Sequence, residues 1–375
     1  MLRKTLITLS ASLMVVVLLS GLLVGCSSQV PATSTVTATT TSTATTTKTA
    51  TETATKTATA TATTTTVVKQ TVLKASTHSN TNHPAVKQLQ YFADLVKERT
   101  GGQVEIEIHD SGSLIGGKDV LNATRSGIVD LGFLVTTYWP TDFPFTNDIA
   151  MEPFACDGWD STPEIMELVR PIKEKELNAQ NMTGLFEIPF NNEFFFKKRV
   201  DPSNPDWSGM KIRDIGGNYT RIIETFGGTP ISMSSTEMPM ALTTGLIQGM
   251  GTSFASYESL DMYDVVPYAY LTGAFYTFGS VEGMNLDAWN KLSPDIQKIL
   301  LDAGKDAESF YIDLNKGNDL GTLEKIKAHP KAELIVLTAE QRETWQNKLA
   351  HIWDIVPDKY GEEGKKFVDA LRSVR

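Results

Sequence analysis

The chain has 375 residues, with 44 acidic and 34 basic side chains and a net charge of −10 at neutral pH. An acidic chain lacks the long-range attraction for phosphate backbones, so no nucleic-acid partner is expected. Its two cysteines, Cys26 and Cys156, exclude a disulfide-rich scaffold and leave the fold dependent on its apolar core.

Residues 1–25 have the pattern of a secretory signal peptide. Basic residues open the segment, residues 13–19 are apolar, and small residues precede Cys26. The run Leu23-Val24-Gly25-Cys26 resembles the bacterial lipobox, in which the thiol of the new N-terminal cysteine receives a diacylglycerol. We therefore expect cleavage before Cys26 and attachment of the body to a membrane by lipid. The alternative is an uncleaved membrane anchor.

Residues 26–66 carry a threonine-rich segment behind the lipidated cysteine. Between Ala32 and Thr66, 21 of 35 residues are Thr and most of the others are Ala. A chain so poor in large apolar side chains cannot offset its conformational entropy, so we expect a disordered stalk. The composition also suits O-glycosylation in a host with the machinery.

The body, residues 67–375, is long enough for two domains and opens with alternating strands and helices. Hydrophobic spacing and end signals predict strands at 72–75, 104–108 and 131–135 and helices at 84–99 and 118–125. Crossover connections of this kind favour an α/β core with largely parallel strands. Ligands gather beyond the carboxyl ends of such strands, which here are the loops 78–83 and 136–145.

A second α/β unit is predicted farther along the chain. Its strands are expected at 194–196, 210–213, 230–233 and 246–249, and its helices at 219–226 and 238–244. Ser234 and Glu237 form a capping box at the start of the second of these helices. A strand at 333–337 and a helix at 339–352, with a second capping box at Thr338 and Gln341, complete the prediction.

The strongest helix signal lies between these elements. Ser293 can cap the helix and Pro294 suits its first position. If the helix continues to Ile326, it spans about 50 Å at 1.5 Å per residue and would bridge both lobes. Gly317 and Gly321 are the candidate positions for a break.

The sequence shows no arrangement typical of an enzyme. It lacks the nucleophile elbow, the zinc-protease motif and the P-loop. Cys156 is expected to be a small buried residue rather than a nucleophile. His78 and His83 lie in a Ser/Asn loop, where capping a helix or touching a solute is favoured over metal binding. We therefore predict no catalytic residues, no cofactor and no metal.

Short segments recur in a characteristic order along the body. They are Thr100-Gly101-Gly102, Gly112-Ser113-Leu114-Ile115-Gly116, Ala123-Thr124-Arg125-Ser126-Gly127, Trp207-Ser208-Gly209-Met210-Lys211-Ile212-Arg213, Gly245-Leu246-Ile247-Gln248-Gly249, and Trp289 with Leu292. Over residues 72–369 this order resembles the extracytoplasmic solute receptors of tripartite ATP-independent periplasmic (TRAP) transporters, of the dicarboxylate-receptor type.

The resemblance implies a two-lobed α/β fold like that of periplasmic binding proteins, with two hinge crossings and a long helix spanning both lobes. Lobe I would comprise residues 67–189 and 278–318, and lobe II residues 190–277 and 319–375. Such a receptor closes on an organic acid and delivers it to the small and large integral membrane subunits of a TRAP transporter. It works outside the cytoplasm, in the periplasm or on the outer face of the cytoplasmic membrane. A receptor that feeds a membrane signalling protein is the alternative.

The resemblance also gives Arg213 the role of pairing with a ligand carboxylate, a charged hydrogen bond that contributes roughly 1.5–3 kcal/mol. Many relatives have a second arginine where this chain has Asn191-Asn192-Glu193, and an asparagine that often contacts ligand is replaced by Thr252. These departures favour a monocarboxylate with an apolar or aromatic body. The aromatic residues of the 136–145 loop can wall a pocket or simply cover the hinge. The candidate ligand-binding residues are His78, Tyr138, Trp139, Asn192, Glu193, Arg213, Thr252 and Phe254.

Overall fold

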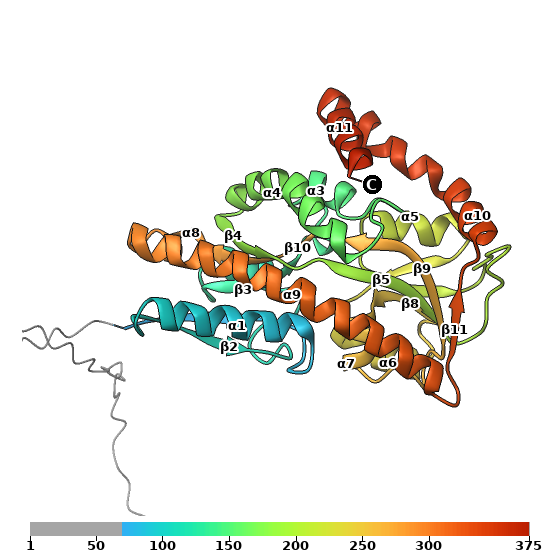
Figure 1. Ribbon diagram of the computed structural model, residues 1–375, viewed down its shortest axis with the longest axis horizontal. Helices are drawn as coiled ribbons and strands as arrows, with labels where there is room; N and C mark the ends of the chain where they lie inside the picture. Colours follow the sequence, from blue (N-terminus) through green and yellow to red (C-terminus); the bar gives the residue numbers. More distant parts are fainter. Residues whose placement is uncertain (1–69, 375) are drawn as a thin grey trace, which may run out of the picture. The chain divides into compact units, whose positions relative to one another are not determined.

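The computed structural model describes residues 70–374, which form two mixed sheets covered by helices (Figure 1). The predicted signal peptide, the lipidation site Cys26 and the threonine-rich segment lie outside the described residues. Among residues 70–374, no helix is both long enough and apolar enough to cross a membrane. Lobe I denotes below the first sheet with the helices packed on it, and lobe II the second sheet with its helices.

The first sheet has the strand order β2-β1-β3-β10-β4. Its strands are β1 (Thr71–Ser76), β2 (Val104–His109), β3 (Leu131–Val135), β4 (Met182–Glu187) and β10 (Ser280–Asn285). The predicted parallel pairing is confirmed for β1 with β2 and with β3. Strand β10 runs antiparallel to β3 and β4, because it re-enters this sheet from the other lobe.

Helices cover the faces of the first sheet. They are α1 (Pro84–Arg99), α2 (Val120–Arg125), α3 (Pro144–Ile149), α4 (Thr162–Ala179) and α8 (Leu286–Trp289). The predicted helical spacing puts Leu89, Phe92 and Val96 of α1 into the core of lobe I. The helix ends before Gly101 and Gly102, both of which have positive φ.

The second sheet has the strand order β11-β9-β5-β8-β6-β7. Its strands are β5 (Phe190–Phe196), β6 (Lys211–Asp214), β7 (Thr229–Ser232), β8 (Gly249–Ser253), β9 (Tyr268–Thr277) and β11 (Glu333–Val336). Its helices are α5 (Asn218–Thr225), α6 (Met238–Thr243), α7 (Phe254–Ser259) and α10 (Ala339–Leu349). Both predicted capping boxes are present.

The predicted strand 246–249 is wrong, because the strand at this place begins only at Gly249. Apolar side chains do not mark β8. Its burial comes instead from two glycines on which aromatic rings lie: a Cβ on Gly249 would meet the Phe196 ring at 2.5 Å, and one on Gly251 would meet the Tyr219 ring at 2.3 Å. Leu246, which suggested a buried strand, is half exposed.

Within the described residues, extended chain crosses between the sheets at two places, as the fold prediction requires. Crossing 1 is Ile188-Pro189, between β4 and β5, and crossing 2 is Phe278-Gly279, between β9 and β10. The Ile188 N–H donates to the carbonyl oxygen of Ser280 at 3.0 Å, so the two crossings lie side by side.

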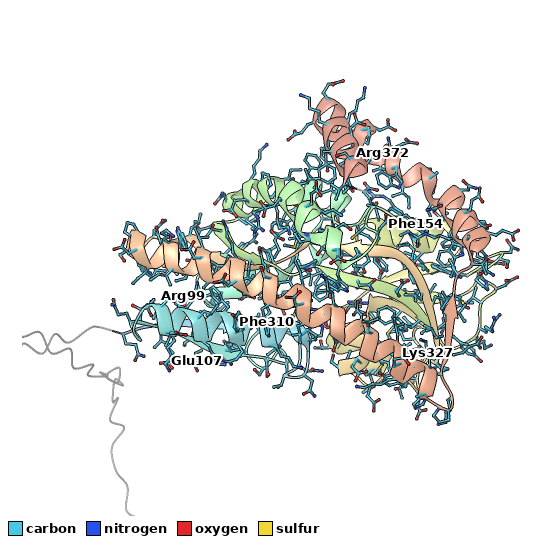
Figure 2. All side chains as sticks on the ribbon, viewed as in Figure 1. Arg99, Glu107, Phe154, Phe310, Lys327 and Arg372 are labelled. Atoms are coloured by element: carbon cyan, nitrogen blue, oxygen red, sulfur yellow. The ribbon has the colours of Figure 1, made fainter. Side chains whose placement is uncertain are left out.

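The long helix α9 (Pro294–Ala328) begins at the predicted cap and spans both lobes. It packs against α1 and β4 in lobe I and against α7 and β11 in lobe II. Figure 2 shows Phe310 of α9 beside α1 and Lys327 at the lobe II end. The helix is continuous through Gly317 and Gly321, where open space surrounds the backbone, so the predicted break is absent from α9.

The chain closes with helix α11 (Ile355–Ser373), which the sequence pattern did not predict. Val356, Phe367, Val368 and Leu371 of this helix belong to the core of lobe I, and α11 contacts α3 and α4 (Figure 1). The sequence-based lobe boundaries had placed this segment in lobe II. We propose that residues 355–373 belong to lobe I, since buried apolar contacts define a lobe.

Candidate functional site

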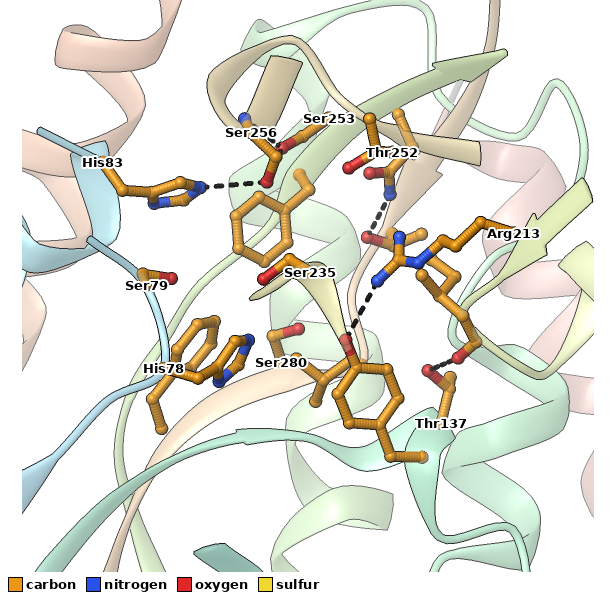
Figure 3. A pocket seen from close by; sticks show the side chains of 18 residues that line it. His78, Ser79, His83, Thr137, Arg213, Ser235, Thr252, Ser253, Ser256 and Ser280 are labelled. Carbon is orange, nitrogen blue, oxygen red and sulfur yellow. Dashed lines mark hydrogen bonds between the residues drawn. The ribbon is translucent and has the colours of Figure 1, made fainter. Parts of the chain in front are cut away.

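A cavity lies between the lobes, with about 50 Å³ open to the centres of water molecules (Figure 3). This volume holds several water molecules and favours a compact ligand. The lining residues come from the loops after β1 and β3, from β5, β6 and β8, and from crossing 2 with its neighbours. They are His78, Ser79, His83, Phe133, Val135, Thr137, Tyr138, Phe190, Asn192, Arg213, Ile215, Ser235, Thr252, Ser253, Ser256, Thr277, Gly279 and Ser280.

Arg213 lies at the carboxyl half of β6 and is only 3% exposed. Its guanidinium donates to the carbonyl oxygens of Met233 (3.2 Å) and Gly251 (2.7 Å), which belong to lobe II. It also donates to the hydroxyl of Tyr138 in lobe I at 3.0 Å. Contacts from both lobes therefore hold the guanidinium in one orientation at the cavity.

None of these three acceptors carries a charge. Within residues 70–374, no carboxylate oxygen lies within 4.0 Å of the Arg213 guanidinium. The neighbouring Asp214 is engaged elsewhere, since it accepts from the Gly216 N–H and the Thr220 hydroxyl, each at 2.8 Å. A guanidinium has five N–H donors, and three are used here. The buried cation therefore keeps both its charge and two donors for an anion from outside the chain.

His78 forms part of the opposite wall of the cavity. Its ring is stacked on Phe133, with centroids 4.9 Å apart and planes within 4°. Burial, with a smaller contribution from the Arg213 charge, lowers the pKa of His78 to about 4. The ring is therefore neutral at physiological pH, and its buried Nδ1 has no hydrogen-bond partner among the described residues. Nδ1 can accept from, or donate to, a bound molecule.

His83 links the start of α1 to lobe II. Its Nδ1 accepts from the Ala85 N–H at 3.1 Å, so it is the N-cap of α1, in agreement with the capping interpretation of the sequence. This bond leaves the proton on Nε2, which donates to the Ser256 hydroxyl at 3.3 Å. Burial and the nearby His78 and Lys87 lower the pKa of His83 to about 3. Arg213 is therefore the permanent cation among the residues that line the cavity.

Hydroxyl groups supply most of the remaining polarity. Those of Ser79, Ser235, Thr252 and Ser280 line the cavity and have no hydrogen-bond partner among the described residues. Asn192 also faces the cavity, and its amide donates to the Thr277 hydroxyl at 2.8 Å. The arrangement can surround a small polar anion with neutral donors while Arg213 compensates its charge.

Several bonds close the cavity by joining the lobes. The Asn80 amide donates to the Ser259 carbonyl oxygen at 3.0 Å, and the Lys118 ammonium group donates to Ser232 at 3.1 and 3.2 Å. The Thr137 hydroxyl donates to the Ile215 carbonyl oxygen. The described conformation is therefore one in which the lobes are in contact around the cavity.

The predicted site residues divide into two groups. His78, Tyr138, Asn192, Arg213 and Thr252 line the cavity. Trp139, Glu193 and Phe254 do not, although each is adjacent in sequence to a residue that does.

The three residues outside the cavity have structural contacts instead. Trp139 packs against the apolar cluster under α2, with its Nε1 donating to the Lys118 carbonyl oxygen at 3.2 Å. Phe254 is fully buried in the core of lobe II against Phe195. Glu193 is fully buried behind the sheet and accepts from the N–H groups of Thr272 (3.0 Å) and Gly273 (2.8 Å).

Sequence reasoning missed much of the apolar wall. Phe133, Phe190 and Ile215 line the cavity, and so do residues on both sides of crossing 2. Phe133 was recognised only as a strand residue, and β10 was not predicted at all. The position of Phe133 near the carboxyl end of β3 was the usable signal, because ligands gather at that edge.

The free thiol of Cys156 is not part of the site. Cys156 is 2% exposed and packs in the core of lobe I, as the sequence suggested. Burial raises the pKa of this thiol, which disfavours the reactive thiolate. Among residues 70–374, no group of three or more His, Cys, Asp and Glu side chains is placed to hold a metal ion.

Two α/β lobes, two adjacent crossings and a polar cavity between the lobes define a two-lobed solute-binding protein. Residues 75–359 match the family described as bacterial extracellular solute-binding protein, family 7. The chain belongs to this family, and its predicted resemblance to TRAP solute receptors is confirmed. One relative is the C4-dicarboxylate-binding periplasmic protein DctP of Rhodobacter capsulatus, 23% identical over 78% of this chain and 88% of that protein.

Solved structures of TRAP receptors share the fold. A marine metagenome TRAP solute-binding protein specific for pyroglutamate has a TM-score of 0.75 at 20% identity, over 81% of this chain and 99% of its own. DctP6 of Bordetella pertussis, an extracytoplasmic solute receptor that binds pyroglutamic acid, has a TM-score of 0.74 at 23% identity, over 81% of this chain and 100% of its own.

Proposed function

We propose that this protein is an extracytoplasmic receptor that binds a small monocarboxylate between its lobes and delivers it to the membrane subunits of a TRAP transporter. The observation that carries the proposal is Arg213, a buried cation whose hydrogen-bond acceptors are all neutral. A bound carboxylate would supply the missing negative charge and two acceptor oxygens. No step of chemistry is required of the site, since its residues suit binding alone.

The charge of the cavity favours one carboxylate over two. Arg213 is the permanent cation in the lining, because the pKa values of about 4 for His78 and about 3 for His83 keep both rings neutral. A second carboxylate would be buried without a counter-charge. The rings of Phe133 and Phe190 offer an apolar surface for the rest of the ligand. Structural neighbours bind pyroglutamate, β-D-galacturonate and malonate, which sets the range of acids to test.

The test is a thermal-shift screen of the purified protein with pyroglutamate, lactate, malonate, succinate and galacturonate. A ligand that binds only the folded state raises the melting temperature by mass action. We expect a monocarboxylate to give the largest shift. Arg213→Ala should abolish it, whereas Arg199→Ala, which removes an exposed arginine paired with Glu333, should leave it unchanged. A shift that survives in Arg213→Ala, or a wild type that responds to none of the acids, would overturn the proposal.

We further propose that the receptor is held at the membrane by lipid on Cys26. The lipobox-like run that ends at Cys26 supports this proposal. Two or more acyl chains give durable attachment where a single short chain does not. Cys26→Ala should move the protein from the membrane fraction to the soluble extracytoplasmic fraction, while a Cys156→Ala variant should stay with the membrane. Membrane retention of Cys26→Ala would rule out the lipid anchor.

A further inference from the structure

One lysine joins the two crossings. Lys173 lies on α4 and is 1% exposed. Its ammonium group donates to the carboxylate of Glu187, the last residue of β4 before crossing 1. The same group donates to the carbonyl oxygen of Phe278, the first residue of crossing 2, at 2.5 Å. A single buried cation therefore bonds to both connections between the lobes.

Further charges complete a network around Lys173. Arg170, one turn earlier on α4, makes a bidentate pair with Glu308 of α9, with both N···O distances at 3.0 Å. Glu308 in turn accepts from the backbone N–H of Glu187 at 2.6 Å. Two cations of α4 thus face two buried carboxylates, one at crossing 1 and one on the helix that spans both lobes. This pairing makes burial of the charges tolerable.

The crossings carry the cavity wall. Gly279 of crossing 2 lines the cavity, as do Thr277 and Ser280 on either side of it, and Phe190 follows crossing 1 directly. Lys173 is not among the lining residues. Its bonds reach the same short segments whose other residues surround the ligand site.

We propose that Lys173 is a positioning residue for ligand binding, which makes the two crossings move as one unit and holds the wall formed by Phe190 and residues 277–280. The consequence for ligand affinity rests on the proposed function, but the coupling of the crossings does not. A cation that bonded to one crossing alone would leave the other free to shift. With both bonded, opening of the lobes requires the crossings to change together.

The test compares four variants of the full chain by amide hydrogen exchange without ligand. Lys173→Met removes the cation, and Lys173→Met/Glu187→Met removes both charges, so that no buried acid is left unpaired if the single variant folds poorly. Lys173→Arg keeps a cation that can reach both acceptors. Lys175→Met is the matched control, because Lys175 is exposed on the same helix two residues away.

We expect both Met-bearing variants at position 173 to exchange at least tenfold faster at the amides of Ile188 and of Phe278 and Ser280 together, with the strands β1 to β3 unchanged. Lys173→Arg should restore slow exchange, and Lys175→Met should match the wild type. Faster exchange at one crossing alone, or a uniform increase across lobe I, would overturn the coupling.

Affinity gives the second readout, with pyroglutamate as the probe in titration calorimetry. We expect the Kd of the double variant to rise at least tenfold, and the Kd of Lys175→Met to stay within twofold of the wild type. An unchanged Kd in the double variant would overturn the positioning role. A wild type that does not bind any of the acids screened above would instead refute the proposed function, and the exchange measurement would still decide whether Lys173 couples the crossings.

Discussion

Two buried cations of this protein differ in how their charge is compensated. Lys173, beside the crossings, bonds to the carboxylate of Glu187 within the chain. Arg213, in the cavity, is equally buried and bonds only to neutral oxygens. A buried charge needs a counter-charge, so the first arrangement is complete without a ligand and the second is not. The difference separates a structural charge from a binding charge, although both side chains are basic residues on regular elements.

The comparison predicts opposite stability effects in the absence of ligand. Lys173→Met should lower the free energy of unfolding by about 3–5 kcal/mol, because it leaves Glu187 buried and unpaired. Arg213→Met breaks no ion pair and should cost clearly less. Urea denaturation of the two variants at neutral pH measures both values. Equal losses would mean that Arg213 is a structural residue, and the comparison would fail.

Glu193 extends the comparison to a buried acid. It accepts bonds from the Thr272 and Gly273 N–H groups and from the Thr272 hydroxyl, and burial raises its pKa to about 8. The folded protein therefore keeps a proton that the unfolded chain releases near pH 4.5, so the free energy of unfolding should fall as pH rises from about 4.5 to about 8.

Two substitutions at this position check the prediction. Glu193→Gln should remove that pH dependence while keeping the fold, since an amide oxygen can still accept from the backbone. Glu193→Ala leaves two buried N–H groups without an acceptor and should cost about 1–3 kcal/mol for each. Chemical denaturation between pH 5 and pH 8 distinguishes these outcomes, and a pH dependence that persists in Glu193→Gln would assign it to another group.

His83 tests a buried group that stays neutral. Its pKa is lowered from 6.5 to about 3, so the unfolded chain binds a proton that the native ring refuses, and the stability contribution is lost as pH falls from about 6.5 toward 3. His83→Asn should keep the cap of α1 and weaken the acid sensitivity. His83→Ala should cost about 1 kcal/mol at pH 7 through loss of the cap. Melting temperatures from pH 7 to pH 4 provide the check, and identical pH profiles for wild type and His83→Asn would contradict it.

The smallest effect is expected at an exposed cation. Lys118 donates to Ser232 across the cavity entrance and lies 5.9 Å from the centre of the Tyr138 ring. Exposed contacts of this kind contribute about 0.5–1 kcal/mol, so Lys118→Met should weaken ligand binding roughly two- to fivefold. The control is Lys291→Met, which removes an exposed lysine elsewhere in lobe I. Calorimetry should show the loss in affinity without a change in ligand-free melting temperature.

Local features of the fold were readable from the sequence because they depend on neighbours in the chain. The N-terminal boundary of α1 at Pro84, the start of α9 at Ser293 and the two capping boxes rest on residues within one helical turn of each other. The alternation of Val104, Ile106 and Ile108 likewise marked β2. Strand β8 was misplaced because its burial depends on the rings of Phe196 and Tyr219, which come from distant segments.

The site was readable only in part for the same reason. The resemblance identified Arg213, but adjacent candidates separate in the fold: Tyr138 lines the cavity and Trp139 does not, and Asn192 lines it and Glu193 does not. Successive side chains of a strand point to opposite faces, and the sequence alone does not say which face meets the cavity.

The sequence by itself determined the order of the elements, the family and the cation that faces the ligand site, since these are carried by short segments. Tertiary structure alone decided which charges are compensated within the chain. Lys173 meets Glu187 fourteen residues away and Phe278 more than a hundred residues away. Arg213 meets no carboxylate in the described part of the chain. Pairing across such distances depends on how the sheets and helices pack, and this packing separates the structural lysine from the arginine left for a ligand.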